Sequence, residues 1–568
     1  MPLVFAGWWM RKLFGRCGFV LLVCLASTGF ARAQVTIKID STLPSDIPGG
    51  APAATLQQAA AFAWQEFIAA NWPALAGTRD TPDPGQKFGA GSSGPLVWQT
   101  YRSKVEIFNL TKDATGAFAP PGYSATDPNF GYDTTPPAYY YATRPVPACQ
   151  GQTAPPSSAW INLDETTQIG LDQMFAGGPA ISNSANTSPQ LIRFAVKANR
   201  VEYSYVAKNQ FYLPGNVKTA AANNVQAYTM HPPVAPKPPF ISFPAGTVEI
   251  KSAWRPLNGN DNPAHFHMQT VRFYENKGKG NTPCYFEQQW GLVALHIIQK
   301  TPSAPAFIYA TFEQAENIRQ PNGTPVEDAD GNVTNPIPGA APTTPAMAYR
   351  DSPTASKVTA TGPFCTPQSN LYFKDSAKQS GLTGGGAICV NRRYEAIPPD
   401  VIAVNKAAHQ AIADYDAAQG IGNSPWSYYK LVSVQPLPFD HGAISPTDPV
   451  HGAAVFFQAN IVVETDYTLQ QFQGRISSSP RGTGAPTAVI APGVPPPNVV
   501  TPAPAAFVAV SGVNMGGCMG CHGNAQVSKG TDFSFILAEG FDPAPETPSA
   551  LGSAVLRAKY LRLFTPSK

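Results

Sequence analysis

The amino-acid sequence predicts an α+β protein, in which a small, mainly helical C-terminal segment is docked on a large domain rich in strands and loops. Hydrophobic residues make up 43% of the 568 residues and aromatic residues 11%, enough to build a sizeable core. The 59 prolines and 48 glycines predict many turns, although their share stays below the ~25–30% typical of disordered chains. Stretches rich in β-branched and aromatic residues outnumber the amphipathic helices, which favours a β-rich fold.

The charge content excludes several classes of protein. Only 13% of residues are charged and the net charge is +3, with no basic block that could follow nucleic-acid phosphates. A coiled coil needs Glu- and Lys-rich faces that are absent here. Beyond the N-terminus no run of ~18 apolar residues occurs, so we expect no membrane-spanning bundle.

Residues 1–33 have the pattern of a secretory signal peptide. Arg11, Lys12 and Arg16 precede an apolar run over 18–30, and an A-x-A cleavage site over 31–33 follows it. An uncleaved anchor helix is the alternative, but the apolar run is short for a span. The mature protein is therefore expected in the periplasm or outside the cell, with no integral membrane span after cleavage.

The large domain is expected over residues 34–475 and begins with a helix over 55–72. Thr55 and Gln58 form a capping box there, and Pro73 ends the helix. Its buried stripe is Leu56, Ala60, Ala63, Trp64 and Phe67. A further helix is expected over 191–212, followed by strands over 246–254, 271–274, 285–299 and 306–312.

Loops are expected over residues 318–388, which are dense in Pro, Gly, Thr and Asn. A second clear helix over 398–419 opens with a Pro-Pro pair and ends at Gly420. Strands over 430–435 and 453–465 complete the large domain. A proline-rich connector over 476–506 leads to the C-terminal segment 507–568, whose last helix is expected over 550–564.

Four cysteines of the large domain remain after removal of the signal peptide. They allow three pairings. We favour Cys365–Cys389, because it closes a glycine-rich loop, and this leaves Cys149–Cys284. The alternative is that some of these cysteines are free and buried.

Residues 518–522 read Cys518-Met519-Gly520-Cys521-His522, the C-x-x-C-H signature for attachment of one c-type haem. Cys518 and Cys521 would bind the two vinyl groups, and the next residue, His522, would be the proximal iron ligand. Two intervening residues let a single helical turn place all three groups. A disulfide or a zinc pair is the alternative, but no second C-x-x-C completes a zinc site.

No Met, His or Cys follows His522, so the sixth iron ligand must come from elsewhere. It could be water or a rare ligand such as Lys529 or Lys559. The upstream candidates are His231, His265, His267, His296, His409, His441, His451, Met174, Met230, Met268 and Met347. The choice affects function, because a six-coordinate iron transfers electrons whereas an open one can bind a small ligand or peroxide.

Three histidine patterns stand out among these candidates. His296 lies in an apolar run and needs a hydrogen-bond partner, for which Glu313 is a candidate. His296 would be a distal iron ligand, an acid/base residue, or a buried core histidine with such a partner. His265 and His267 form an H-x-H that would share one side of a strand, as in metal sites, or lie in a loop. His441 and His451 sit at turns before the haem motif. Either could approach the iron, but the polar composition of turns explains these two histidines equally well.

Several segments resemble a family of uncharacterised, secreted bacterial mono-haem c-type cytochromes. The matching segments cover most of the mature chain in order: WQEFIAANWP (64–73), NRVEY (199–203), EIKSAWRPL (249–257), GLVALHIIQKT (291–301), FIYATFEQAEN (307–317), YYKLVSVQ (428–435), FQANIVVETDYTLQQF (457–472) and CMGCHGNAQ (518–526) with DFSFIL (532–537). The resemblance carries over the haem residues Cys518, Cys521 and His522. It implies no particular reaction.

The sequence thus predicts an exported cytochrome with one haem c that transfers electrons in the periplasm. Its partner would be a redox protein or a small-molecule electron donor or acceptor. The alternative is a haem oxidoreductase, peroxidase-like or oxygenase-like, with an open distal site formed by the large domain. No G-x-S-x-G, P-loop or G-x-G-x-x-G site indicates another chemistry.

Overall fold

A computed structural model describes the chain from Val35 onward. The described residues are 35–91, 94–108, 110–112, 115–136, 141, 146–152, 160–166, 174–176, 190–229, 235–317, 324–334, 366–373, 387–390, 396–437, 460, 489–490, 513–514, 517–527, 529–539 and 545–547. The predicted signal peptide lies outside them. The described residues also leave out almost all of the proline-rich connector and of the strand expected over 453–465. They leave out the whole helix expected over 550–564.

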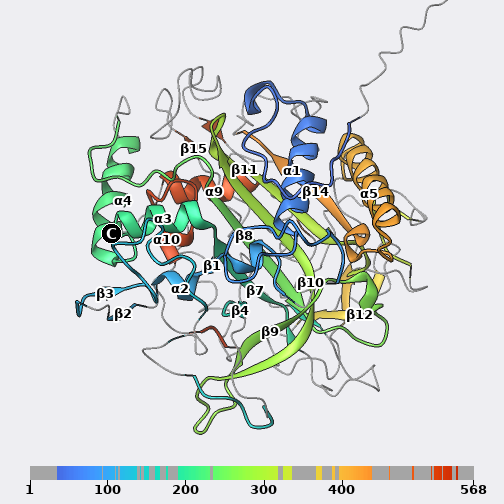
Figure 1. The fold of residues 1–568 in the computed structure, drawn as a ribbon, viewed down its shortest axis with the longest axis horizontal. Coiled ribbons are helices and arrows are strands. Elements are labelled where there is room, and N and C mark those ends of the chain that lie inside the picture. Colours follow the sequence, from blue (N-terminus) through green and yellow to red (C-terminus); the bar gives the residue numbers. More distant parts are fainter. Residues whose placement is uncertain are drawn as a thin grey trace, which may run out of the picture. The chain divides into compact units, whose positions relative to one another are not determined.

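The described part combines helices with a large sheet-rich region, as the predicted α+β class requires (Figure 1). The helices are α1 Leu56–Ala70, α2 Lys104–Phe108, α3 Arg200–Lys208, α4 Pro214–Thr229, α5 Pro399–Gln419, α9 Gly517–Val527 and α10 Ile536–Glu539. The strands are β1 Arg102–Ser103, β2 Thr111–Lys112, β3 Phe118–Ala119, β4 Ile161–Leu163, β5 Met174–Ala176, β6 Gln190–Leu191, β7 Arg193–Ala198, β8 Val248–Arg255, β9 Met268–Glu275, β10 Cys284–Thr301, β11 Ala304–Gln314, β12 Thr366–Phe373, β13 Ala387–Val390, β14 Tyr429–Gln435, β15 Val489–Ile490 and β16 Val513–Asn514.

The central sheet has the strand order β1-β7-β8-β10-β11-β14, with β9 and β4 continuing from the first half of β10. All its pairs are antiparallel except β4 with β9. The predicted strands over 246–254, 271–274, 285–299, 306–312 and 430–435 are therefore confirmed as β8, β9, β10, β11 and β14. The 18-residue β10 connects the two halves of the sheet, because it pairs with β9 first and with β8 and β11 further along.

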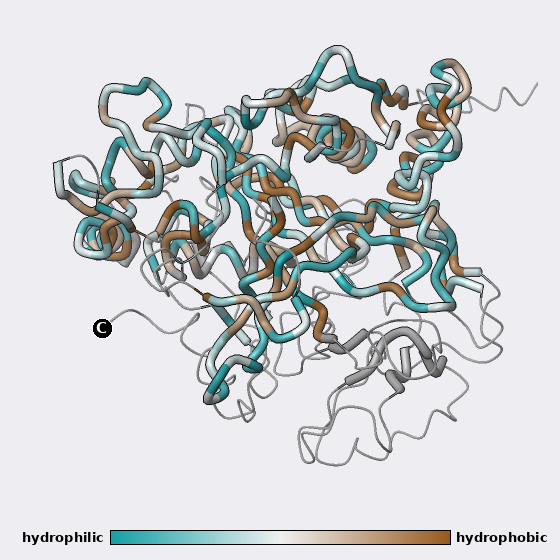
Figure 2. The backbone as a smooth tube through the Cα atoms, turned by 60° about the horizontal axis from the view of Figure 1, so that its bottom comes forward, coloured by the Kyte–Doolittle hydropathy of each residue, from teal (hydrophilic) through white to brown (hydrophobic). Residues whose placement is uncertain are grey.

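The two faces of this sheet support different cores. Alternate residues of β10 and β11, such as Leu295, Ile297 and Phe312, belong to a core shared with α1 and α5. The residues between them, such as Ile298 and Tyr309, belong to a second core with residues of α3, α4, α9 and α10. Figure 2 shows hydrophobic residues recurring along the strands and helices, as this double burial requires.

Both clearly predicted helices are confirmed together with the caps that end them. Thr55 and Gln58 form the expected capping box at the start of α1, and the helix ends three residues before Pro73. Helix α5 ends at Gly420, which has a φ of 67° in the left-handed region. Glycine is favoured there because it has no Cβ to clash.

The helix expected over 191–212 is wrong in its first half. The chain forms strand β7 up to Ala198, and helix α3 begins only after Asn199, whose side chain caps it by accepting from the N–H of Glu202. Strand β7 is buried on both faces, so its apolar residues alternate too little to distinguish a strand from a buried helix. The loops expected over 318–388 are interrupted by β12 and by the start of β13, which pair with each other.

One predicted disulfide is confirmed. Cys149 and Cys284 are joined, and they connect the start of β10 to a segment 135 residues earlier. The other predicted pair cannot be followed, because Cys365 and the side chain of Cys389 lie outside the described residues.

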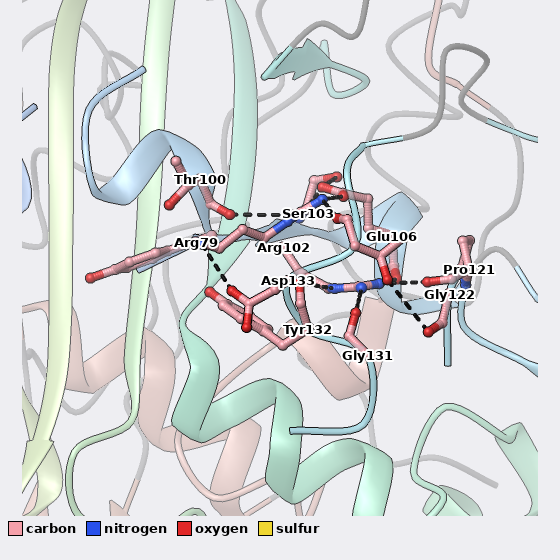
Figure 3. A network of polar contacts seen from close by, with 12 residues as sticks. Arg79, Thr100, Arg102, Ser103, Glu106, Pro121, Gly122, Gly131, Tyr132 and Asp133 are labelled. Atoms are coloured by element: carbon pink, nitrogen blue, oxygen red, sulfur yellow. Dashed lines mark hydrogen bonds and ion pairs between the residues drawn. The ribbon is translucent and has the colours of Figure 1, made fainter. Parts of the chain in front are cut away.

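A network of buried charges holds α2 and the loops beside it (Figure 3). Glu106 of α2 accepts a hydrogen bond from Arg79 at 2.6 Å. The guanidinium of Arg102 donates hydrogen bonds from all three of its nitrogens to backbone carbonyls, those of Glu106, Pro121, Gly131 and Tyr132. Because this one side chain bonds carbonyls near both ends of the segment 119–134, the segment depends on it for its shape.

Candidate functional site

Helix α9 carries the C-x-x-C-H motif in its first two turns. Cys518, Met519, Cys521 and His522 all lie between the bounds Gly517 and Val527, as the spacing predicts. For Cys521 only the backbone is described. The motif residues are therefore on one helix, with the histidine directly after the second cysteine.

The start of α9 is fixed to β14, the last strand in the order of the central sheet among the described residues. The N–H of Met519 donates to Oε1 of Gln435 in β14 at 3.0 Å. The first N–H groups of a helix have no partner within the helix, so this side chain satisfies one of them. Met519 itself is buried in the second core.

His522 is oriented by a backbone carbonyl. Its Nδ1 donates to the carbonyl of Phe533 at 2.9 Å, and the rings of Tyr309 and Phe535 lie 4.8 and 5.2 Å from its imidazole. Burial lowers the pKa of His522 to about 4, although the Phe533 carbonyl favours the charged form, so the ring is neutral at pH 7. A neutral ring with its proton on Nδ1 presents the lone pair of Nε2, the atom that ligates metals.

The carbonyl of Phe533 belongs to a turn with an unusual backbone. Gly530, Asp532 and Phe533 all have positive φ, at 68°, 54° and 64°. Two such non-glycine residues in succession are strained, and they persist only where the surroundings determine them. This turn, residues 529–534, connects α9 to the residues before α10.

Contacts from three elements hold the turn in place. The carboxylate of Asp532 accepts from Lys300 of β10 at 2.6 Å and from the N–H of Phe243 at 2.5 Å. Asn224 of α4 donates to the carbonyl of Gly530 at 2.8 Å. Burial raises the pKa of Asp532 to about 6 in spite of the nearby Lys300. The central sheet and α4 therefore fix this turn. The turn then orients His522 through the carbonyl of Phe533.

His296 lies on the sheet face that bears α9. It is two residues from Ile298 on β10, and Ile298 pairs directly with Tyr309, whose ring contacts His522. Successive residues on one face of a strand are about 6.6 Å apart, so His296 is one step along this face. Burial, followed by the nearby Lys251 and His522, lowers the pKa of His296 to about 3.

Glu313, the partner expected for His296, does not stand directly opposite it on β11. Thr311 stands opposite His296, with its Oγ1 3.4 Å from Nε2. Glu313 stands opposite Ala294, and its carboxylate lies 4.0 Å from Nζ of Lys430. His296 is half-buried, which is consistent with each of the three roles that the sequence leaves open.

The H-x-H pattern does not form a shared site. His265 lies in a 3₁₀ turn, not on a strand, where Nδ1 contacts Glu316 at 2.8 Å and the ring stacks on Tyr428. His267 instead contacts Gln99 at 2.9 Å and stacks on Trp426. Burial lowers the pKa of His267 to about 4, so this ring is also neutral at pH 7.

His409 is likewise committed elsewhere. Its Nδ1 contacts Asp330 at 2.6 Å and its Nε2 contacts the carbonyl of Tyr429 at 2.8 Å, so both ring nitrogens are occupied. Met268 begins β9, and Lys529 opens the turn after α9. The remaining candidates, whose positions or side chains are outside the described residues, are His231, His441, His451, Met174, Met230, Met347 and Lys559.

Sequence reasoning missed the residues that support His522. Phe533 acts through its backbone carbonyl, and such a group leaves no trace in the sequence. Tyr309 is one of several aromatic residues in a β-rich stretch, and Gln435 is the last residue of a strand.

The comparisons with known proteins add no assignment. No family model, no curated protein and no solved structure matches the chain. Among the described residues, no group of three or more His, Cys, Asp or Glu side chains could hold a metal ion between them. None of the described helices has the length and apolarity to cross a membrane.

Proposed function

We propose that the protein is an exported c-type cytochrome that carries one covalently bound haem and transfers electrons in the periplasm. Cys518 and Cys521 would bind the haem, and His522 would be the proximal ligand. The observation that carries the proposal is the state of His522: a neutral ring with Nδ1 donated to the Phe533 carbonyl at 2.9 Å. A histidine ligand almost always donates its other ring N–H in this way.

The donor set fits a haem better than other uses of two cysteines and a histidine. The three residues lie on one helix whose start and following turn are both fixed to the central sheet. A bound haem would supply a one-electron iron centre. The chain would supply its attachment, the orientation of the imidazole and an apolar surrounding formed by Tyr309 and Phe535.

We propose His296 as the sixth ligand. Of the described histidines it is the one whose strand position shares a sheet face with the residues against His522. Its Nε2 lies 3.4 Å from Oγ1 of Thr311, which is long for a hydrogen bond. Neutral imidazole is also the form that ligates iron.

Covalent attachment is tested by producing the full chain in a bacterium that has the cytochrome c maturation machinery. We expect the denatured protein to keep the mass of one haem and the reduced form to absorb at about 550 nm. The Cys518→Ser/Cys521→Ser double variant should lose both signals. A wild-type protein without covalent haem under these conditions refutes the proposal.

The sixth ligand is tested by the optical and EPR spectra of the haem-loaded protein. We expect a wild type that is low-spin in the ferric form and does not bind carbon monoxide when reduced, and a His296→Ala variant that is high-spin and does bind it when reduced. The control is His409→Ala, which removes a histidine bound to Asp330 and the Tyr429 carbonyl, and it should leave the spectrum unchanged. A low-spin spectrum that persists in His296→Ala excludes this ligand.

The same spectra decide between electron transfer and the second candidate, a haem oxidoreductase. A high-spin wild type that reacts rapidly with peroxide would favour the oxidoreductase. The observation that keeps this function open is His296 itself, because its half-buried, neutral imidazole could line an open distal site instead of ligating the iron.

A further inference from the structure

The carbonyl of Phe533 accepts two hydrogen bonds, and only one of them comes from His522. The hydroxyl of Tyr309 donates to the same oxygen at 3.1 Å, beside the 2.9 Å bond from Nδ1. The Tyr309 ring also lies 4.8 Å from the imidazole. Tyr309 therefore touches His522 directly and also competes for the acceptor that orients it.

The position of Tyr309 is set by the central sheet and not by the turn that it contacts. Tyr309 lies in the middle of β11, where it pairs with Ile298 of β10 and with Gln435 of β14. Gln435 is the residue that holds the N–H of Met519. Two directly paired residues of the sheet thus fix the two ends of the site, one at the start of α9 and one at the Phe533 carbonyl.

We propose that Tyr309 is a positioning residue that sets how strongly the Phe533 carbonyl draws on the Nδ1 proton of His522, and thereby the reduction potential of the iron. The inference rests on the proposed haem attachment. It assigns no chemical step to Tyr309. It assigns to its hydroxyl the tuning of the proximal ligand.

The physical reason is the sharing of one acceptor. A carbonyl oxygen has two lone pairs, and two donors on it each receive less of its electron density than one donor alone. Without the tyrosine hydroxyl, the bond from Nδ1 should strengthen, which makes His522 a more basic ligand. A more basic ligand stabilises the ferric state and lowers the potential.

The test is the Tyr309→Phe variant, which keeps the ring against His522 and removes only the hydroxyl. We expect its midpoint potential to fall, with a change of about two- to tenfold in the ratio of reduced to oxidised protein at a fixed potential. A tenfold change corresponds to 59 mV for a one-electron couple. The proton NMR signal of the His522 Nδ1–H should shift at the same time.

The matched control is Tyr205→Phe. Tyr205 also packs against the second core and uses its hydroxyl for backbone contacts, with the carbonyl of Phe240 and the N–H of Ser242, but it does not contact His522. Both variants should lose some thermal stability, whereas only Tyr309→Phe should change the potential and the Nδ1 signal.

Failure of this inference is distinguishable from failure of the proposed function. If the wild type carries haem and Tyr309→Phe keeps the wild-type potential and Nδ1 signal, the tuning role is refuted and the haem proposal stands. A rise in potential also refutes it, because it would mean that the hydroxyl strengthens the histidine bond. If the wild type carries no covalent haem, the proposed function itself has failed.

Discussion

Replacement of Glu106 by glutamine is expected to lower the free energy of unfolding by about 3 kcal/mol at pH 7. Glu106 is 1% exposed, and Arg79, Arg102 and Lys197 around it are all buried. Burial alone would raise the pKa of Glu106, but these three cations together lower it to about 2. The carboxylate is therefore the charge that compensates them.

The partners of the cations explain the size of this effect. Among the described residues, Lys197 donates to the carbonyls of Gln99 and Tyr101, at 2.6 and 3.0 Å. Arg102 likewise donates to carbonyls (Figure 3). Carbonyl dipoles satisfy hydrogen bonds but carry no net charge, so glutamine would leave the buried guanidinium groups of Arg79 and Arg102 without the carboxylate that compensates them.

The pH dependence gives this prediction a second readout. The pKa of Glu106 is about 2 in the folded protein and 4.5 ordinarily, so its contribution is complete above pH 4.5 and is lost as the pH falls towards 2. The stability gap between wild type and Glu106→Gln should therefore narrow between pH 5 and pH 2.5. Urea unfolding followed by tryptophan fluorescence measures both quantities.

The control for Glu106→Gln lies at the edge of the same network. Asp133 bonds Arg200 at 2.7 Å, but its side chain is 39% exposed. A solvent-exposed pair of this kind contributes at most about 1 kcal/mol. If Asp133→Asn destabilises the protein as much as Glu106→Gln, the buried charge is not the cause.

The sequence predicted those parts of the fold that depend on local chemistry. Thr55 with Gln58 and Gly420 mark helix ends through contacts within four residues, so the caps were visible. Five strands of the central sheet, β8 to β11 and β14, were visible as β-branched and aromatic stretches, whereas the short β1 and β4 were not. Strand β7 was not, because burial on both faces removes the alternation that distinguishes a strand from a helix.

The candidate site likewise has a local part that the sequence predicted and a part from distant segments that it did not predict. The C-x-x-C-H motif is local, and its place on a helix followed from its spacing. The groups that support His522 come from distant parts of the chain: the Tyr309 hydroxyl, Gln435 and the backbone of residues 529–534. His296 could be proposed from its apolar context, but only the register of β10 with β11 places it on the face of His522.

Replacement of Gly530 by alanine is the second large effect that we expect, about 3 kcal/mol in the free energy of unfolding. Gly530 has a φ of 68°, and a Cβ there would lie 2.1 Å from the carbonyl oxygen of Ala221. That oxygen belongs to the backbone of α4, so no side-chain rotation relieves the clash. Helix α4 and the turn 529–534 would have to separate.

The chain contains a matched control for this substitution. Gly420 has nearly the same φ, 67°, but a Cβ there would meet nothing within 4 Å. Gly420→Ala therefore measures the conformational cost alone, about 1 kcal/mol. The difference between the two variants in urea unfolding isolates the contact with Ala221.

Separation of α4 from the turn should also reach the haem, if our proposal is correct. Asn224 of α4 donates to the carbonyl of Gly530, and the same turn presents the carbonyl of Phe533 to His522. Gly530→Ala is thus expected to shift the Nδ1–H signal of His522 in the haem-loaded protein, whereas Gly420→Ala is not. Equal stability losses in the two variants would mean that α4 yields to the new methyl group, and the turn would then depend on Asp532 and the sheet instead.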